Sequence, residues 1–118
     1  MPDQLSKRER AVLRNLAAEA HEQELEDVLS DLYDKFCIWG GKGMNAFDLS
    51  ELIHEFHDGV SRELYKTYVL GAPEISVAIG VSRGAIDPDD LDKKLYMKIS
   101  PIVDSIEKHH ENKDDEAT

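Results

Sequence analysis

Residues 6–38, SKRERAVLRNLAAEAHEQELEDVLSDLYDKFCI, decide the fold, because nothing in this stretch interrupts a helix: it contains neither Pro nor Gly. Its apolar residues mostly recur at steps of three and four, the spacing of one face of an α-helix. Ser6 followed by Glu9 is a capping-box pattern, which predicts that the helix begins there. The apolar face comprises Val12, Leu16, Ala20, Leu25, Val28, Leu29, Leu32 and Phe36.

A helix of about 30 residues is roughly 45 Å long, which is longer than one small domain needs. The chain has 118 residues, of which 41% are hydrophobic and 33% charged. This composition predicts one domain with one core, and it excludes a disordered chain or a membrane span. The surplus helix must therefore lie against later helices of the same chain or against a second copy of the chain.

The charge of the long helix is segregated along its length. Residues 1–14 carry four basic and two acidic residues, whereas residues 15–34 carry seven acidic residues and no basic one. An antiparallel pair of such helices would place the basic end of one chain near the acidic half of the other. The alternative is a solvated charged face. We expect a homodimer, and the predicted interface comprises Arg8, Arg10, Arg14, Val12, Leu16, Leu25, Leu29, Leu32 and Trp39.

Glycines at positions 40, 41 and 43 end the long helix, and a central amphipathic helix is predicted from Asp48 to about Val69. Asp48 with Glu51 is a second capping pair. Gly59 at the margin of the apolar stripe indicates a close helix crossing, and we expect Phe56 to lie in the core. The stripe comprises Leu49, Leu52, Ile53, Phe56, Val60, Leu64 and Tyr68.

Residues 73–82 alternate as a strand would, but we predict a helix because the chain offers no second strand for pairing. Asp87 before Pro88 predicts the start of another helix, and Ser100-Pro101 predicts its end. The expected fold is all-α: a small bundle with a long N-terminal helix, a central amphipathic helix and two or three short C-terminal helices. We predict one domain over residues 1–108 and a disordered acidic tail over residues 109–118.

The central helix carries the richest set of potential metal ligands. Glu51 and His54 form the Glu-x-x-His unit that di-iron bundles use. At about 100° per residue, Glu51, His54 and Asp58 fall opposite the apolar stripe, so we predict no buried metal site. His57 lies at the edge of the stripe, where we expect a half-buried, hydrogen-bonded imidazole. A small metal-dependent enzyme using Glu51, His54 and His57 is one alternative function.

A second alternative is a nucleic-acid-linked regulator. Gly-Val-Ser-Arg at 80–83 looks like the turn of a helix-turn-helix DNA binder. However, Ala78 precedes the turn glycine by two positions rather than about four, and acidic residues follow at 87, 89 and 90. The Gly-Lys-Gly at 41–43 lacks the remaining residues of a phosphate-binding Walker A loop.

The formal net charge of −11 argues against nucleic acid as a partner. The single cysteine, Cys37, excludes an intrachain disulfide and favours a reducing, cytoplasmic setting, where we expect it to be a small core residue. We expect Trp39 to anchor the core. The sequence shows no catalytic set and indicates no cofactor, so we expect a soluble, non-enzymatic interaction module. Its partner would be a second copy or another protein, with no membrane involved.

Overall fold

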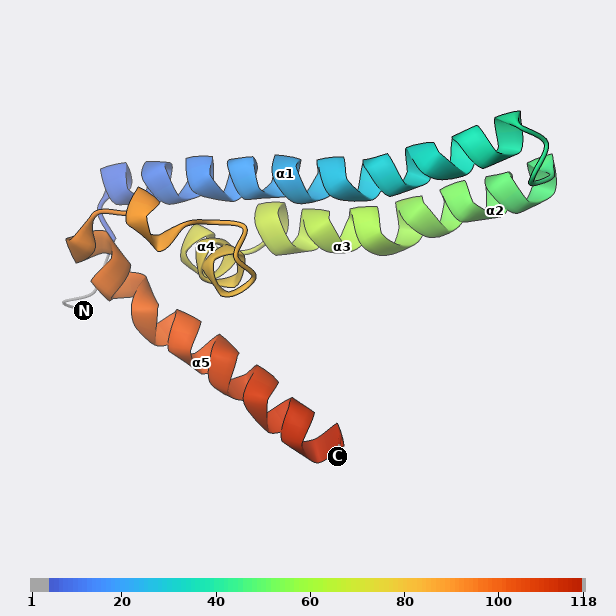
Figure 1. Cartoon of the computed structure of the whole chain (residues 1–118). Coiled ribbons are helices and arrows are strands. Elements are labelled where there is room, and N and C mark those ends of the chain that lie inside the picture. Colours follow the sequence, from blue (N-terminus) through green and yellow to red (C-terminus); the bar gives the residue numbers. More distant parts are fainter. Residues whose placement is uncertain (1–4, 118) are drawn as a thin grey trace.

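The computed structural model describes residues 5–117, and the side chains of residues 5–110. All regular elements in this part of the chain are helices, which confirms the all-α fold. In Figure 1, α1 runs alongside a second rod that is built from α2, η1, α3 and η2. The short helix α4 lies beside the first half of α1, and α5 begins near the start of α1 and runs obliquely away from it. The elements are α1 (Lys7–Gly40), α2 (Ala46–Phe56), η1 (His57–Ser61), α3 (Arg62–Tyr65), η2 (Lys66–Leu70), α4 (Pro73–Ser82), η3 (Pro88–Asp90) and α5 (Lys93–Ala117).

The predicted capping box begins α1. The Ser6 hydroxyl accepts a hydrogen bond from the Glu9 backbone N–H at 3.0 Å, and the Ser6 N–H donates to the Glu9 carboxylate at 2.9 Å. The same carboxylate oxygen accepts from the Lys98 ammonium group on α5 at 2.8 Å. The hydrogen bond from Lys98, followed by that from the Ser6 backbone, lowers the pKa of Glu9 from 4.5 to about 2. The cap therefore also ties the first helix to the last one.

The second rod differs from the prediction in two details. It begins at Ala46 rather than at Asp48, because the Asn45 side chain accepts from the Asp48 backbone N–H at 2.8 Å and caps the helix there. The expected close crossing at Gly59 is wrong, since a Cβ atom built on this glycine meets nothing within 4 Å. Gly59 instead lies in η1, a π-helical turn that continues α2.

Residues 73–82 are helical, as predicted, and form α4. This helix packs against α1, η2 and α5, and it buries residues 76, 77, 78 and 80. Because neighbours cover it on several sides, its apolar residues need not follow a helical period, which explains the strand-like alternation. The buried Ser76 hydroxyl donates to the Thr67 carbonyl oxygen at 2.7 Å, and this bond joins α4 to the end of the second rod.

A close approach at Gly80 lets the chain turn back after α4. Gly84 adopts a φ of +80°, and the Ala85 and Ile86 N–H groups both donate to the Gly80 carbonyl at 2.9 and 3.1 Å. A Cβ atom at Gly80 would lie 2.5 Å from Ile86 Cδ1. Glycine at position 80 therefore leaves room for the Ile86 side chain, and glycine at position 84 accommodates the left-handed backbone.

The C-terminal region forms one long helix rather than two short ones. Asp87 caps only the short turn η3, and α5 begins after Asp92, whose carboxylate accepts from the Leu95 N–H at 2.8 Å. Pro101 lies inside α5, so the prediction that it ends a helix is wrong. In a regular helix the N–H of residue 101 would donate to the Met97 carbonyl, and proline has no N–H to do so. The Ser100 hydroxyl donates to this carbonyl instead, at 3.4 Å. The proposed tail at 109–118 lies largely outside the described side chains, although α5 runs to Ala117.

The hydrophobic core is confined to one end of the molecule, which extends 59 × 39 × 22 Å. The buried residues of α1 all lie in its first half, at positions 13, 17 and 20. They meet side chains from η2, α4 and α5, so the later helices cover part of the surplus length of α1. The core cluster comprises Leu13, Ala17, Ala20, Leu64, Tyr68, Val77, Ile86, Leu91, Leu95 and Ile99.

Glu9→Gln is expected to lower stability at neutral pH, because it removes the charged acceptor shared by Ser6 and Lys98. The folded-state pKa of Glu9 lies below its ordinary value, so its contribution is present above pH 4.5 and disappears as the pH falls to about 2. Urea unfolding of both proteins across this range measures the difference. Glu19→Gln, at an exposed position of α1, is the control. A difference between Glu9→Gln and the unsubstituted protein that does not change with pH would contradict this account.

Gly80→Ala is expected to destabilise by about 1 kcal/mol, because overpacking costs about 1–3 kcal/mol and helix propensity returns only about 1. Ile86→Val removes the nearest atom and should reduce this cost. Gly59→Ala meets open space and should instead stabilise by about 0.5–1 kcal/mol. Chemical denaturation of the four variants, the double variant included, measures both effects. Shifts of the same sign for the two alanine variants would show that the Ile86 contact does not constrain position 80.

Candidate interaction surface

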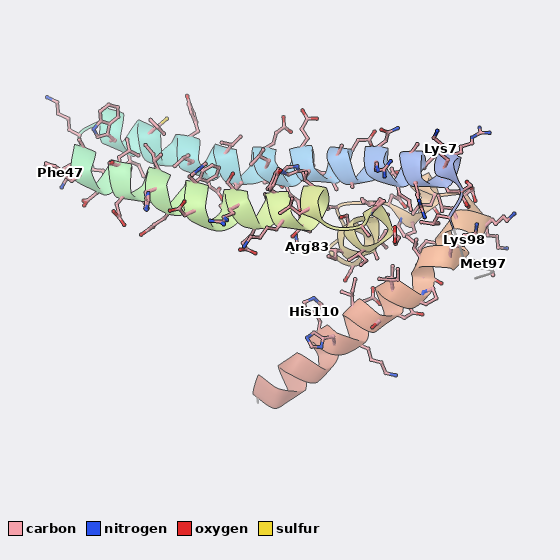
Figure 2. All side chains as sticks on the ribbon, turned by 180° about the vertical axis from the view of Figure 1, so that it is seen from behind. Lys7, Phe47, Arg83, Met97, Lys98 and His110 are labelled. Atoms are coloured by element: carbon pink, nitrogen blue, oxygen red, sulfur yellow. The ribbon has the colours of Figure 1, made fainter. Side chains whose placement is uncertain are left out.

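The hairpin formed by residues 25–60 extends beyond the core, and we call this part the distal arm. Its only buried hydrophobic residue among those described is Leu49, at 4% exposure. Figure 2 shows Phe47 at the far end of the arm, away from Lys7, and Phe47 is 87% exposed. A two-helix arm has no third layer to cover its apolar side chains. Those that remain exposed are Leu29, Tyr33, Phe36, Ile38, Trp39, Phe47, Ile53 and Val60.

A groove of about 380 Å³ runs along the distal arm between α1 and the α2–η1 part of the second rod. Its floor is apolar, and its rim carries two carboxylates and one ammonium group. Such a groove is suited to an apolar helix of a partner, with charged groups at the edge to select it. The lining residues are Val28, Asp31, Leu32, Lys35, Leu52, Glu55, Phe56 and Val60.

Three residues expected in the core lie on the arm instead. Trp39 is 43% exposed and packs edge-to-face on Phe36, with ring centroids 6.4 Å apart. Cys37 is exposed, and Phe56 is only half-buried. The predictions for Trp39, Cys37 and Phe56 are wrong for the same reason. Helical spacing identifies an apolar face, but no third helix among the described residues covers that face on the arm.

The structure divides the interface predicted from the sequence into inner and outer residues. Leu16 and Leu25 are half-buried against the core of their own chain. Leu32 lies in the groove, and Leu29 is 44% exposed on the arm. Val12 is also exposed, as are the basic side chains at positions 8, 10 and 14 near the start of α1. The residues still available to a partner thus include both the arm and the basic end of α1.

The candidate metal ligands do not assemble into a site. His54 Nε2 lies 3.0 Å from the Asp58 carboxylate, and the two side chains are 70% and 53% exposed. Glu51 is exposed, and so is His57, which corrects the half-buried position expected for it. Within the described residues, no group of three His, Cys, Asp or Glu side chains could hold a metal ion.

We call the end of the molecule that holds the core the base. A second cavity, of about 420 Å³, lies at the base between α1, η2 and the start of α4. Its polar groups include Arg14, Glu22 and His21, and the His21 ring stacks on Tyr68 at 5.9 Å. The Tyr68 hydroxyl is buried without a hydrogen-bond partner, and burial raises the pKa of this phenol. A phenol that stays protonated at neutral pH offers neither a base nor a nucleophile. The sequence pattern does not reveal this cavity, because residues 14–25 and residues 68–73 meet only in the folded chain.

The segment that looks like a DNA-binding turn is partly buried: Val81 and Ser82 are half-buried, and Arg83 is exposed. Its glycine, Gly80, is buried, and α5 begins only at Lys93, well after the turn. Arg83 Nη1 lies 3.3 Å from the Glu24 carboxylate on α1, which fixes the C-terminal end of α4 to the middle of α1. This segment therefore positions helices within the fold.

Comparison with protein-family models, with curated proteins and with solved structures finds no match to this chain. In the part of the chain that the structure describes, none of the helices combines the length and the apolar content needed to cross a membrane.

His54→Ala is expected to change the free energy of unfolding by no more than about 0.5 kcal/mol, because an exposed i,i+4 pair contributes little. Leu64→Ala, at a buried position of the same rod, should cost about 2–5 kcal/mol and serves as the control. Thermal and urea unfolding measure both. A large loss in the His54 variant would require a structural role for the pair with Asp58.

Proposed function

We propose that this protein is a non-enzymatic interaction module that self-associates through α1, using the distal arm. The observation that carries the proposal is the exposure of large apolar side chains along the arm, which ranges from 39% for Ile53 to 87% for Phe47. Extended exposed apolar surfaces of this kind mark protein interaction sites. A reducing, cytoplasmic setting and the absence of nucleic-acid or membrane partners remain part of the proposal.

Charge supports a second copy of the chain as the partner. The first fourteen residues are net basic and the following twenty are strongly acidic, so one copy offers both signs to another. The side chains of Arg8, Arg10 and Arg14 are exposed, and so are most of the acidic ones. With a net charge of −11, a chain that pairs with itself is repelled by its own acidic residues, and any contact between a basic and an acidic side chain lowers that repulsion.

Sedimentation equilibrium of the full chain over a micromolar concentration series tests the proposal, and a reversible dimer is expected. Val60→Ser removes apolar area that is already 40% exposed in the single chain, so the fold should survive. It should raise the dimer dissociation constant by about tenfold or more, because both copies lose the same contact. Val69→Ser, 50% exposed but at the base, is the matched control.

A chain that stays monomeric throughout the series would overturn self-association. A dimer that Val69→Ser weakens and Val60→Ser does not would place the interface at the base, and the proposal for the arm would fail.

A further inference from the structure

We infer that the second copy seats its own distal arm antiparallel in the groove between α1 and α2–η1, so that two hairpins complete one four-helix bundle. This inference rests on the proposed function. It adds which face of α1 meets the second copy, how the two arms are oriented and where the two-fold axis lies. Two hairpins that meet on their apolar grooves give each helix the second neighbour that it lacks in the single chain.

The groove faces the same side of α1 as the C-terminal end of α4. Arg83 at that end contacts Glu24 on α1. Asp31 and Lys35 follow Glu24 by seven and eleven residues, which is about two and three helical turns, so all three share one face of α1. At the base this side is occupied by α4, and on the distal arm it is the open groove. The groove is thus the uncovered continuation of a face that the fold buries elsewhere.

The position of α4 sets the direction of the partner. In a parallel pair, both α4 helices would lie at the same end and on the same side, and the two Arg83 guanidinium groups would meet. In an antiparallel pair, the tip of each arm points toward the base of the other copy. In Figure 1 the arm consists of α1 and the second rod alone, and α5 runs obliquely away from them.

The length of the free surface sets the register. On α1 it begins after Glu24, where the end of α4 is attached, and ends at Gly40. Sixteen residues of helix span about 24 Å, and the midpoint of the interval lies at Leu32. Leu32 lines the groove, so a two-fold axis near it places apolar side chains of both copies at the centre.

The rim charges complement each other in this register. With the axis at Leu32, Asp31 lies about 3 Å along the helix from Lys35 of the other copy, and the symmetry repeats the contact. Lys35 is the only cation among the groove-lining residues, whereas Asp31 and Glu55 are both acidic. Glu55 therefore leaves one carboxylate per copy in excess.

Four variants of the full chain test this arrangement by sedimentation equilibrium at low salt, with circular dichroism to check folding. Lys35→Glu and Asp31→Lys each replace two attractive contacts by two repulsive ones and should raise the dissociation constant by about tenfold or more. An equimolar mixture of these two variants should form a heterodimer about as tight as the unsubstituted dimer, because every introduced charge then faces its opposite. Glu55→Gln removes the excess acid and should tighten the dimer severalfold.

Joint reversal of Arg8, Arg10 and Arg14 to Glu is the matched control. These residues lie near the start of α1, beyond the overlap of the two arms. At about 0.15 M salt, where the Debye length is about 8 Å, their reversal should leave the dissociation constant within about twofold. A weakened dimer in this control would instead support pairing along the whole of α1 and overturn the register at Leu32.

The remaining outcomes separate this inference from the proposed function. A dimer that is unaffected by Lys35→Glu and Asp31→Lys would leave the proposed self-association intact, but it would show that the groove is not the dimer interface. Weakening by both without recovery in the mixture overturns the antiparallel register. An unsubstituted chain that is monomeric overturns the proposed function itself.

Discussion

The burial of α4 is the interaction on which the rest of this structure depends. This short helix packs against the first half of α1, the end of the second rod and the start of α5, and the core forms where these four meet. Gly80 admits Ile86 at close range, and the Ser76 hydroxyl satisfies the Thr67 carbonyl. A side chain at position 80 would press on Ile86, and loss of the Ser76 hydroxyl would remove a hydrogen bond between α4 and the second rod.

The same packing explains why half of the molecule is left uncovered. A helix of ten residues spans about 15 Å, whereas α1, with 34 residues, spans about 51 Å. The second rod follows α1 along its far half, but two helices cannot enclose their own apolar faces. The exposed side chains of the arm are therefore a direct result of unequal helix lengths, and they give the proposed interaction surface its physical basis.

Helix chemistry could be predicted wherever the relevant bonds are local. Ser6 and Glu9 cap α1 as the sequence indicates, Pro73 opens α4, and His54 points away from the core as the helical angle requires. The prediction that Pro101 ends a helix failed because neighbouring residues compensate for the proline. Proline has no N–H to donate to the Met97 carbonyl, but the Ser100 hydroxyl donates to it instead. In addition, Ile99 and Val103 on either side of Pro101 are buried, and their packing stabilises the helix.

The sequence by itself determined that the chain is helical, that its first helix is unusually long and that its charge is divided along that helix. It could do so because periodicity, caps and composition act within a few residues. Only the tertiary structure decided which part of each apolar face is buried. Ala20 and Phe36 belong to the same predicted apolar face, yet one is 1% and the other 40% exposed, because later helices cover the first and none of the described helices covers the second.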